Sequence, residues 1–196
     1  MIAVLDYGAG NLKSITNLLD TLDVQYVVTD NRETILSADR LIFPGVGHFA
    51  QLMESLNEKK LVPVIKEFID SGKMFLGICL GFQALFEESE EAPGCAGLGI
   101  FKGKVVKFTR GKVPQIGWNR LKITPTNNVL SNDYVYFVNS YYVVPENKNI
   151  VSAYADYHGD FTASVEYRNV FGMQFHPEKS GEVGHEIIKR WLVKQC

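Results

Sequence analysis

The sequence predicts an α/β fold in which a mostly parallel central sheet is flanked by helices, with an antiparallel β elaboration in the second half. Two observations carry this prediction. In the first half, short apolar runs alternate with amphipathic stretches of helical spacing. In the second half, β-rich segments follow one another with turns between them. Strand–helix–strand order implies right-handed crossovers and a parallel sheet that is covered on both faces.

The first half of the chain supplies strands and helices in alternation. The expected strands are short apolar or β-rich runs at Ile2–Leu5, Gln25–Val28, Leu41–Phe43 and Met74–Ile78. The expected helices place apolar residues on one face, over residues 12–22, 49–56 and 64–69. Ser71-Gly72 ends the last of these helices, because glycine is a typical signal at a helix C-terminus.

Beyond a polar loop over Glu87–Gly99, the chain is rich in β-branched and aromatic residues. The expected strands lie at Lys104–Phe108, Arg120–Ile123, Tyr134–Val138, Tyr141–Val144, Val151–Tyr154, Phe161–Tyr167 and Val170–Phe175. We expect a tight turn over residues 167–170, in which Asn169 tolerates a positive φ. Apolar residues over 183–192 have the spacing of a final helix that can close the sheet.

Composition is that of an ordinary globular protein. The 196 residues fit a single domain over 1–196; 46% are apolar, 21% are charged and the net charge is −2. A near-neutral chain has no excess charge that would draw it to phosphate, so nucleic acid is not an expected partner. The mainly apolar run over residues 74–86 is too short to span a bilayer, and the first residues lack a signal peptide's basic segment.

The cysteines and histidines favour a cytoplasmic protein without a metal. Cys79, Cys95 and Cys196 are an odd number without the spacing of a disulfide frame or a zinc site. The 4 histidines form no HExxH motif and have no paired cysteines. We therefore expect reduced thiols, no metal and no cofactor.

A cysteine flanked by glycines stands where the strand over residues 74–78 turns into a helix, in Gly77-Ile78-Cys79-Leu80-Gly81. This is the pattern of a nucleophile elbow with cysteine in place of serine, since small neighbours admit a close chain crossing. The helix start favours a thiolate at Cys79, and the Leu80 N–H would serve the same pocket as an oxyanion donor. A small buried hydrophobic residue at a strand end remains an alternative.

A histidine and a carboxylate follow the strand over residues 170–175, in His176-Pro177-Glu178. Pro177 favours extended geometry at His176, and residues two apart on an extended chain face the same side. Taken by itself, the tripeptide is better explained as a strand-terminating proline turn with exposed His176 and Glu178, because such tripeptides are common. However, both motifs follow strands, and ligands gather at the carboxyl ends of parallel strands. Together they predict a triad of Cys79 as nucleophile, His176 as base and Glu178 as orienter.

Glycines also flank Val46, in the segment Pro44-Gly45-Val46-Gly47 that directly follows the strand over residues 41–43. A peptide next to glycines reorients at low cost, so the Val46 N–H can be aimed at a developing oxyanion. An ordinary strand-to-helix turn is the alternative for these residues.

Further segments complete a set that runs in order through most of the chain. They are Asp6-Tyr7-Gly8-Ala9-Gly10-Asn11, Pro44-Gly45-Val46-Gly47-His48-Phe49, Gly77-Ile78-Cys79-Leu80-Gly81, Leu85-Phe86-Glu87-Glu88-Ser89-Glu90-Glu91-Ala92-Pro93-Gly94, Gly117-Trp118-Asn119 and Gly172-Met173-Gln174-Phe175-His176-Pro177-Glu178-Lys179-Ser180. Through this highly specific set the chain resembles the class I, triad-type glutamine amidotransferases. Among these it is most similar to glutaminase subunits of imidazole glycerol phosphate synthase.

The resemblance implies hydrolysis of glutamine to glutamate and ammonia. It implies Cys79, His176 and Glu178 as the catalytic triad and Val46 and Leu80 as oxyanion donors. The residues implied around the amino-acid end of glutamine are Gly45, Gly47, Gln83, Glu91, Ser140 and Tyr141. A carboxylate such as Glu91 suits an α-ammonium group. An acidic run such as residues 87–91 is also typical of a solvated face.

The resemblance further implies a heterodimer with a (β/α)₈ cyclase subunit. There the ammonia reacts with a ribonucleotide to give imidazole glycerol phosphate and aminoimidazole-carboxamide ribonucleotide in histidine synthesis. Positions matching Asn11, Trp118 and Lys179 lie at that interface in the family. The simpler alternatives are a loop asparagine, a core tryptophan and a solvated lysine.

Other functions stay open on the sequence. Gln115 and Asn139 stand where the family commonly has histidine, which leaves room for a paralogous glutaminase that feeds another barrel partner, as in surface-sugar amidination. A nucleotide-binding module is a second alternative, because Gly8-Ala9-Gly10 resembles part of a dinucleotide fingerprint, but Lys13 replaces its third glycine. A stand-alone cysteine hydrolase or peptidase is a third.

Overall fold

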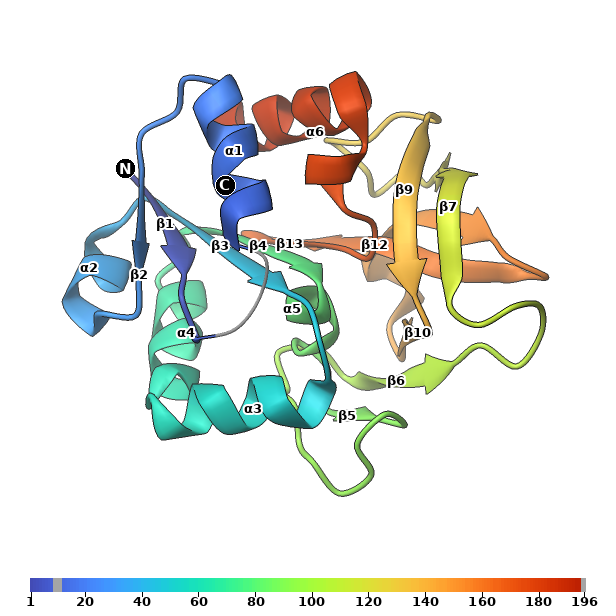
Figure 1. Ribbon diagram of the computed structural model, residues 1–196, viewed down its shortest axis with the longest axis horizontal. Coiled ribbons are helices and arrows are strands. Elements are labelled where there is room, and N and C mark those ends of the chain that lie inside the picture. Colours follow the sequence, from blue (N-terminus) through green and yellow to red (C-terminus); the bar gives the residue numbers. More distant parts are fainter. Residues whose placement is uncertain (9–11, 195–196) are drawn as a thin grey trace.

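The computed structural model describes residues 1–8 and 12–194. Within them an 11-stranded sheet runs through the molecule, and its first part is parallel (Figure 1). The parallel strands lie side by side in the order β2 (Tyr26–Thr29), β1 (Ile2–Leu5), β3 (Arg40–Gly45), β4 (Met74–Cys79) and β13 (Val170–Met173). Every residue of β1, β4 and β13 is buried, as expected for strands covered on both faces.

Helices cover both faces of the parallel strands (Figure 1). On one face lie α1 (Leu12–Thr21) and α6 (Gly181–Val193). On the other lie α2 (Arg32–Ser37), α3 (Phe49–Glu58), α4 (Leu61–Asp70) and the short α5 (Leu80–Gln83). Each face has its own buried apolar cluster, so the sheet is packed as the middle layer of three. None of the described helices is long and apolar enough to cross a membrane.

Beyond β13 the sheet continues through strands of the second half. They are β12 (Asp160–Tyr167), β10 (Tyr141–Pro145), β6 (Gly103–Lys107) and β5 (Glu88–Ser89), with β11 (Val151–Asp156) and β8 (Lys122–Ile123) branching from β12. All these pairings are antiparallel except β5 with β6. A separate antiparallel pair, β7 (Gln115–Arg120) and β9 (Tyr134–Asn139), stands beside them (Figure 1). Short 3₁₀ helices occupy Lys148–Ile150 and Pro177–Lys179.

The predicted fold class is therefore confirmed, and the differences are local. The helix α2 was not expected; Asn31 starts it by accepting a hydrogen bond from the Thr34 N–H. The strand expected over residues 120–123 is reduced to β8, while its first residue ends β7, which pairing with β9 defines. The polar loop over residues 87–99 contains β5.

The turn between β12 and β13 differs in its chemistry from the prediction. It is Arg168, with a φ of 54°, that occupies the left-handed region, rather than Asn169. The Asn169 side chain is buried, and its amide donates to the carbonyl oxygens of Ile69 and Lys73, each at 2.8 Å. Asn169 therefore ties this turn to the end of α4 and the start of β4.

We expect Asn169→Ala to lower the free energy of unfolding by about 2 kcal/mol, because it removes two hydrogen bonds to backbone carbonyls in a buried place. Denaturant unfolding followed by circular dichroism measures this change. Asn57→Ala, on the exposed side of α3, is the matched control and should stay within about 0.5 kcal/mol of the parent. Equal stability of the two variants would contradict the role of Asn169.

Candidate active site

Cys79 occupies a strained turn between β4 and α5. Its φ of 53° and ψ of −110° lie outside the regions that side-chain-bearing residues ordinarily adopt. Such a conformation costs of order 1–3 kcal/mol and persists only where the surrounding structure enforces it. The turn presents the sulfur, which is 8% exposed, at the carboxyl end of a central strand. The strand-to-helix elbow predicted around Cys79 is thus the geometry observed.

Glycines make this turn possible by allowing backbone segments to touch. A Cβ atom at Gly81 would lie 2.1 Å from the Phe43 carbonyl oxygen. A Cβ atom at Gly45 would lie 2.3 Å from the Gly81 nitrogen. No larger residue fits at either position without moving the backbone, so the end of β3 and the start of α5 are locked together beside Cys79.

The sheet order brings His176 and Glu178 to the same place. β13 pairs in parallel with β4, with Gly172 opposite Gly77, so the chain beyond β13 emerges beside Cys79. The His176 backbone N–H donates to the Tyr136 carbonyl oxygen at 2.9 Å, which fixes the histidine against β9. His176 Nδ1 lies 2.8 Å from Glu178 Oε1, and both side chains are buried. The structure therefore brings together the three residues predicted as a triad.

The electrostatic environment of His176 favours the imidazolium form. Burial alone would lower the pKa of His176. Charge on Cys79 and Glu178, and hydrogen bonds to both, act in the opposite direction and raise its pKa from 6.5 to about 10. At neutral pH the ring thus holds a proton between a sulfur and a carboxylate. This is the form from which a proton can be given to a leaving group.

Gln174 is a site residue that the motifs did not predict. Its Nε2 lies 3.6 Å from Cys79 Sγ, and its Oε1 accepts from Gln83 Nε2 at 2.9 Å. The same Gln83 nitrogen donates to the Tyr141 carbonyl oxygen at 3.0 Å. A chain of buried amides therefore supports the sulfur from behind. The strand period of two, which puts Gln174 on the side of His176, is the signal that could have found it.

A cavity of about 310 Å³ opens in front of Cys79. Its lining residues are Val46, Gly47, Cys79, Leu80, Gln83, Glu91, Pro114, Val138, Asn139, Ser140, Tyr141, His176 and Lys179. All the residues predicted for glutamine binding line this cavity except Gly45, which is the last residue of β3. The volume suits a small amino-acid ligand, and Cys79 and His176 stand in one wall.

Glu91 is built into the cavity wall and is not part of a solvated face. Its Oε2 accepts a hydrogen bond from the Phe49 N–H at the start of α3, at 2.8 Å. The other glutamates of the run are exposed, although Glu87 and Glu90 each accept a backbone N–H. Burial, followed by the charges of Glu91 and Glu90, raises the pKa of Tyr141.

Comparison with known proteins agrees with this geometry. The model of the family "Glutamine amidotransferase class-I" matches residues 3–195. The chain belongs to the class I glutamine amidotransferases. It is 45% identical to "Imidazole glycerol phosphate synthase subunit HisH" of Bacillus cereus (strain G9842), over 97% of this chain and 93% of that protein. It is 44% identical to the subunit of the same name from Bacillus subtilis (strain 168), over 97% and 95%. The predicted family is thus confirmed, down to the HisH subunits.

The fold comparison points the same way. A solved structure described as "Crystal structure of glutamine amidotransferase" matches with a TM-score of 0.78 over 98% of this chain and 96% of its own. At 18% identity this match shows the fold alone.

The amidotransferase has no group of three or more His, Cys, Asp or Glu side chains placed to hold a metal ion among its described residues.

The two predicted oxyanion donors differ in their orientation. Leu80 is the first residue of α5, so its N–H lies at the helix start directly after Cys79. The Val46 N–H instead donates to the Tyr7 hydroxyl at 3.4 Å. The Val46 N–H is thus engaged by Tyr7 in this conformation of the amidotransferase.

Two of the residues predicted for the partner interface, Trp118 and Lys179, lie among the described residues. Lys179 is exposed and lines the cavity. Trp118 is 55% exposed on β7 and meets Tyr136 edge-on at 5.7 Å, so it is not a core residue. Ile116 and Tyr134 are also exposed on this strand pair, giving the amidotransferase an apolar patch. Asn11 lies outside the described residues.

Gln115 and Asn139 face each other across β7 and β9. Both are buried, and the Asn139 amide nitrogen donates to the Tyr141 carbonyl oxygen at 2.9 Å. Asn139 lines the cavity, whereas Gln115 does not. Asn139 thus borders the site, and Gln115 lies next to it across the strand pair.

We expect the His176 imidazole to titrate near pH 10 in the free protein, and its pKa to fall in Cys79→Ala, because charge on Cys79 is a main cause of the shift. Nuclear magnetic resonance of ¹⁵N-histidine-labelled protein measures both values. Since the folded pKa exceeds the unfolded value of about 6.5, this proton stabilises the fold fully below pH 6.5. That contribution is lost between there and pH 10. A pKa unchanged by Cys79→Ala would contradict the coupling.

Proposed function

We propose that this chain, acting as one domain over residues 1–196, is the glutaminase subunit of an imidazole glycerol phosphate synthase in the cytoplasm. It hydrolyses glutamine to glutamate and ammonia. The observation that carries the proposal is the buried Cys79–His176–Glu178 constellation at the wall of a cavity of about 310 Å³. Family membership supports it, since HisH relatives at 45% identity are named as subunits of that synthase.

Covalent catalysis follows from the arrangement. The Cys79 sulfur attacks the γ-amide carbon of glutamine, forming a C–S bond and a tetrahedral oxyanion. His176 gives its proton to the amide nitrogen as the C–N bond breaks, releasing ammonia and leaving a glutamyl thioester. His176 then takes a proton from water, which attacks the thioester and frees glutamate and Cys79. Glu178 holds the imidazole at Nδ1 throughout, which keeps Nε2 for this proton transfer.

The oxyanion is stabilised by two backbone N–H groups, one directly after Cys79 in the chain and one from the loop that follows β3. Leu80 supplies one from the start of α5. Val46 supplies the second after its peptide turns towards the cavity. Each donor of this kind contributes about 10²–10³ in kcat, because it is aimed where charge develops in the transition state.

The cavity wall matches the charges of an amino acid. Glu91 receives the α-ammonium group, and the hydrogen bond from Phe49 fixes its carboxylate for that purpose. Gly47, Ser140 and Tyr141 present their backbone and hydroxyl groups to the α-carboxylate end. Gln83, held by Tyr141 and Gln174, closes the side next to Cys79.

Ammonia is passed to a partner subunit, a (β/α)₈ cyclase. The apolar patch of Ile116, Trp118 and Tyr134 and the neighbouring Lys179 suit a protein interface, because exposed aromatic residues are typical anchors. We propose that Asn11 belongs to the same interface.

Glutamine hydrolysis should be measured in three mixtures: this chain alone, with the histidine-pathway cyclase, and with that cyclase and its ribonucleotide. A large rise only in the third supports the proposal, whereas low activity in all three overturns it. If a glutamine analogue still labels Cys79 in that case, the result indicates another acceptor subunit.

We expect Cys79→Ala to abolish glutamine-dependent product formation by the complex, while ammonia-dependent formation survives, because only the glutaminase step needs the sulfur. His176→Ala should be nearly as severe, and Glu178→Ala milder, since an orienter contributes less than a nucleophile or base. Steady-state assays with glutamine and with ammonium salts measure the difference. Survival of glutamine use in Cys79→Ala would refute the assignment of the nucleophile.

We expect Trp118→Ala to weaken the affinity for the cyclase by about thirtyfold in Kd, as for a hot-spot aromatic residue worth about 2 kcal/mol. Isothermal titration calorimetry measures this value. Val28→Ala serves as control, because Val28 is 38% exposed on β2, an edge strand of the large sheet on the side of the molecule away from β7 (Figure 1). Equal affinities of the two variants would show that Trp118 is not an anchor.

A further inference from the structure

The Val46 N–H is held by a residue outside the cavity. It donates to the Tyr7 hydroxyl at 3.4 Å. Tyr7 follows β1 and Val46 follows β3, and these strands are parallel neighbours whose carboxyl ends meet. Val46 is 38% exposed and lines the cavity, whereas Tyr7 is 1% exposed and does not. The hydrogen bond therefore directs this N–H into the protein.

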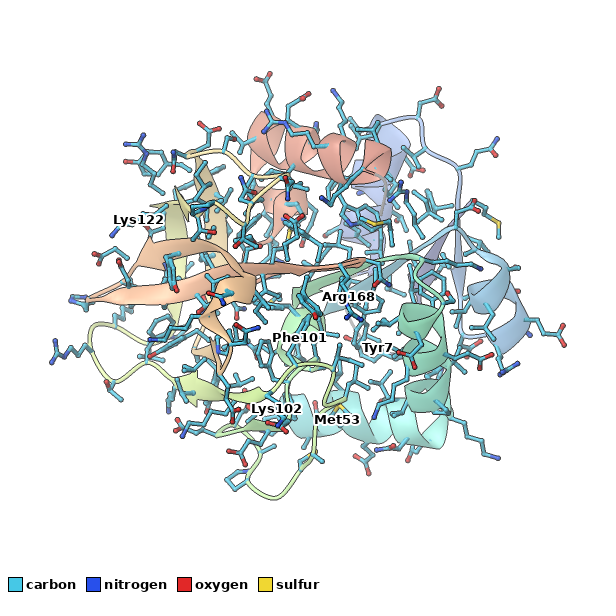
Figure 2. The ribbon with its side chains drawn as sticks, turned by 180° about the vertical axis from the view of Figure 1, so that it is seen from behind. Tyr7, Met53, Phe101, Lys102, Lys122 and Arg168 are labelled. Carbon is cyan, nitrogen blue, oxygen red and sulfur yellow. The ribbon has the colours of Figure 1, made fainter. Side chains whose placement is uncertain are left out.

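The position of the Tyr7 hydroxyl is fixed by packing. The Tyr7 ring meets the Phe43 ring edge-on, with centroids 5.9 Å apart and planes at 89°. Both belong to the buried cluster on the side of α3 and α4, which also contains Met53; Tyr7 and Met53 are labelled in Figure 2. Burial is the main cause that raises the pKa of Tyr7, so the hydroxyl stays neutral and remains an acceptor at neutral pH.

The loop has the freedom that a turned peptide needs. Gly47 has a φ of 104°, and a Cβ atom there would meet no atom within 4 Å, so space surrounds it. Gly45, on the other side, is packed against Gly81 at its Cα, but without a Cβ atom its ψ is little restricted, so the peptide that follows it can turn. Rotation of the peptide between Gly45 and Val46 breaks only the bond to Tyr7 among the hydrogen bonds of the Val46 N–H. The strength of that bond thus sets how often the N–H reaches the cavity.

We propose that Tyr7 is a positioning residue whose hydroxyl withholds the Val46 N–H from the oxyanion and thereby limits glutamine hydrolysis by the isolated chain. This inference rests on the proposed glutaminase reaction. One N–H cannot serve two acceptors, so the population with the Val46 N–H in the cavity competes with the population bound to Tyr7. A neutral hydrogen bond biases such an equilibrium by about two- to tenfold.

The test is Tyr7→Phe, which removes the hydroxyl and keeps the ring against Phe43. For the isolated chain we expect kcat for glutamine hydrolysis to rise about two- to tenfold with KM unchanged, because only the transition state uses the freed N–H. Saturation with the cyclase and its ribonucleotide should bring the ratio of variant to parent towards one. An unchanged or lower kcat in the folded variant would overturn the proposal.

Tyr157→Phe is the matched control. It also removes a tyrosine hydroxyl that is hydrogen-bonded to the backbone, here by donating to the Lys112 carbonyl oxygen at 2.6 Å, and it does not touch Val46. Its kcat should equal that of the parent. A second measurement needs no variant: the Val46 amide should exchange hydrogen more slowly in the isolated chain than the Gly47 amide. Rapid exchange at Val46 would overturn the proposal even if Tyr7→Phe did not fold.

Cys79→Ala separates this inference from the proposed function. If hydrolysis by the parent is abolished by Cys79→Ala but is unaffected by Tyr7→Phe, the glutaminase stands and the role of Tyr7 is refuted. If hydrolysis is absent in every mixture, or survives Cys79→Ala, the proposed function itself fails.

Discussion

Backbone contact between Gly45 and Gly81 sets the geometry on which the rest of the site depends. Because neither residue has a Cβ atom, the end of β3 and the start of α5 approach closely enough for the chain to bend sharply at Cys79. The strain stored at Cys79 is offset by the packing of β4, all of whose residues are buried. The same contact seats the Val46 loop directly beside the sulfur. The Cys79 turn and the Val46 loop thus share one rigid crossing.

Sheet topology supplies what this crossing lacks. The parallel pairing of β4 with β13 delivers His176 from far along the chain to the sulfur, and the short turn at Pro177 folds Glu178 back onto the imidazole. Gln174 and Gln83 then fill the space behind Cys79 with satisfied amides. The antiparallel strands of the second half build the opposite cavity wall through Ser140 and Tyr141. The exposed residues of β7 and β9, which include Ile116, Trp118 and Tyr134, form the proposed partner surface.

Local patterns predicted the parallel strands and their helices except α2, and they predicted that Cys79, His176 and Glu178 come together. Buried strands are indicated by short apolar runs, and amphipathic helices by apolar residues at helical spacing. The glycines around Cys79 indicate the tight turn, because the turn needs residues without a Cβ atom. Features that depend on contacts between distant segments could not be predicted from local patterns. The strand β7 is defined by its pairing with β9, and Gln174 belongs to the site because it contacts Cys79. Asn169 was assigned to the turn backbone because nothing local reveals its bonds to Ile69 and Lys73. The sequence alone does not distinguish Glu91 from the other glutamates of its run, because its hydrogen bond from the Phe49 N–H joins residues far apart in the chain.

The proposed reaction requires Cys79 alone to be the nucleophile for glutamine. Treatment of the chain with a diazo-ketone analogue of glutamine, followed by peptide mapping by mass spectrometry, tests this requirement directly. We expect a single adduct on Cys79, prevented by excess glutamine and absent in His176→Ala. An adduct on Cys95 or Cys196, or labelling of Cys79 that glutamine does not compete, would contradict it.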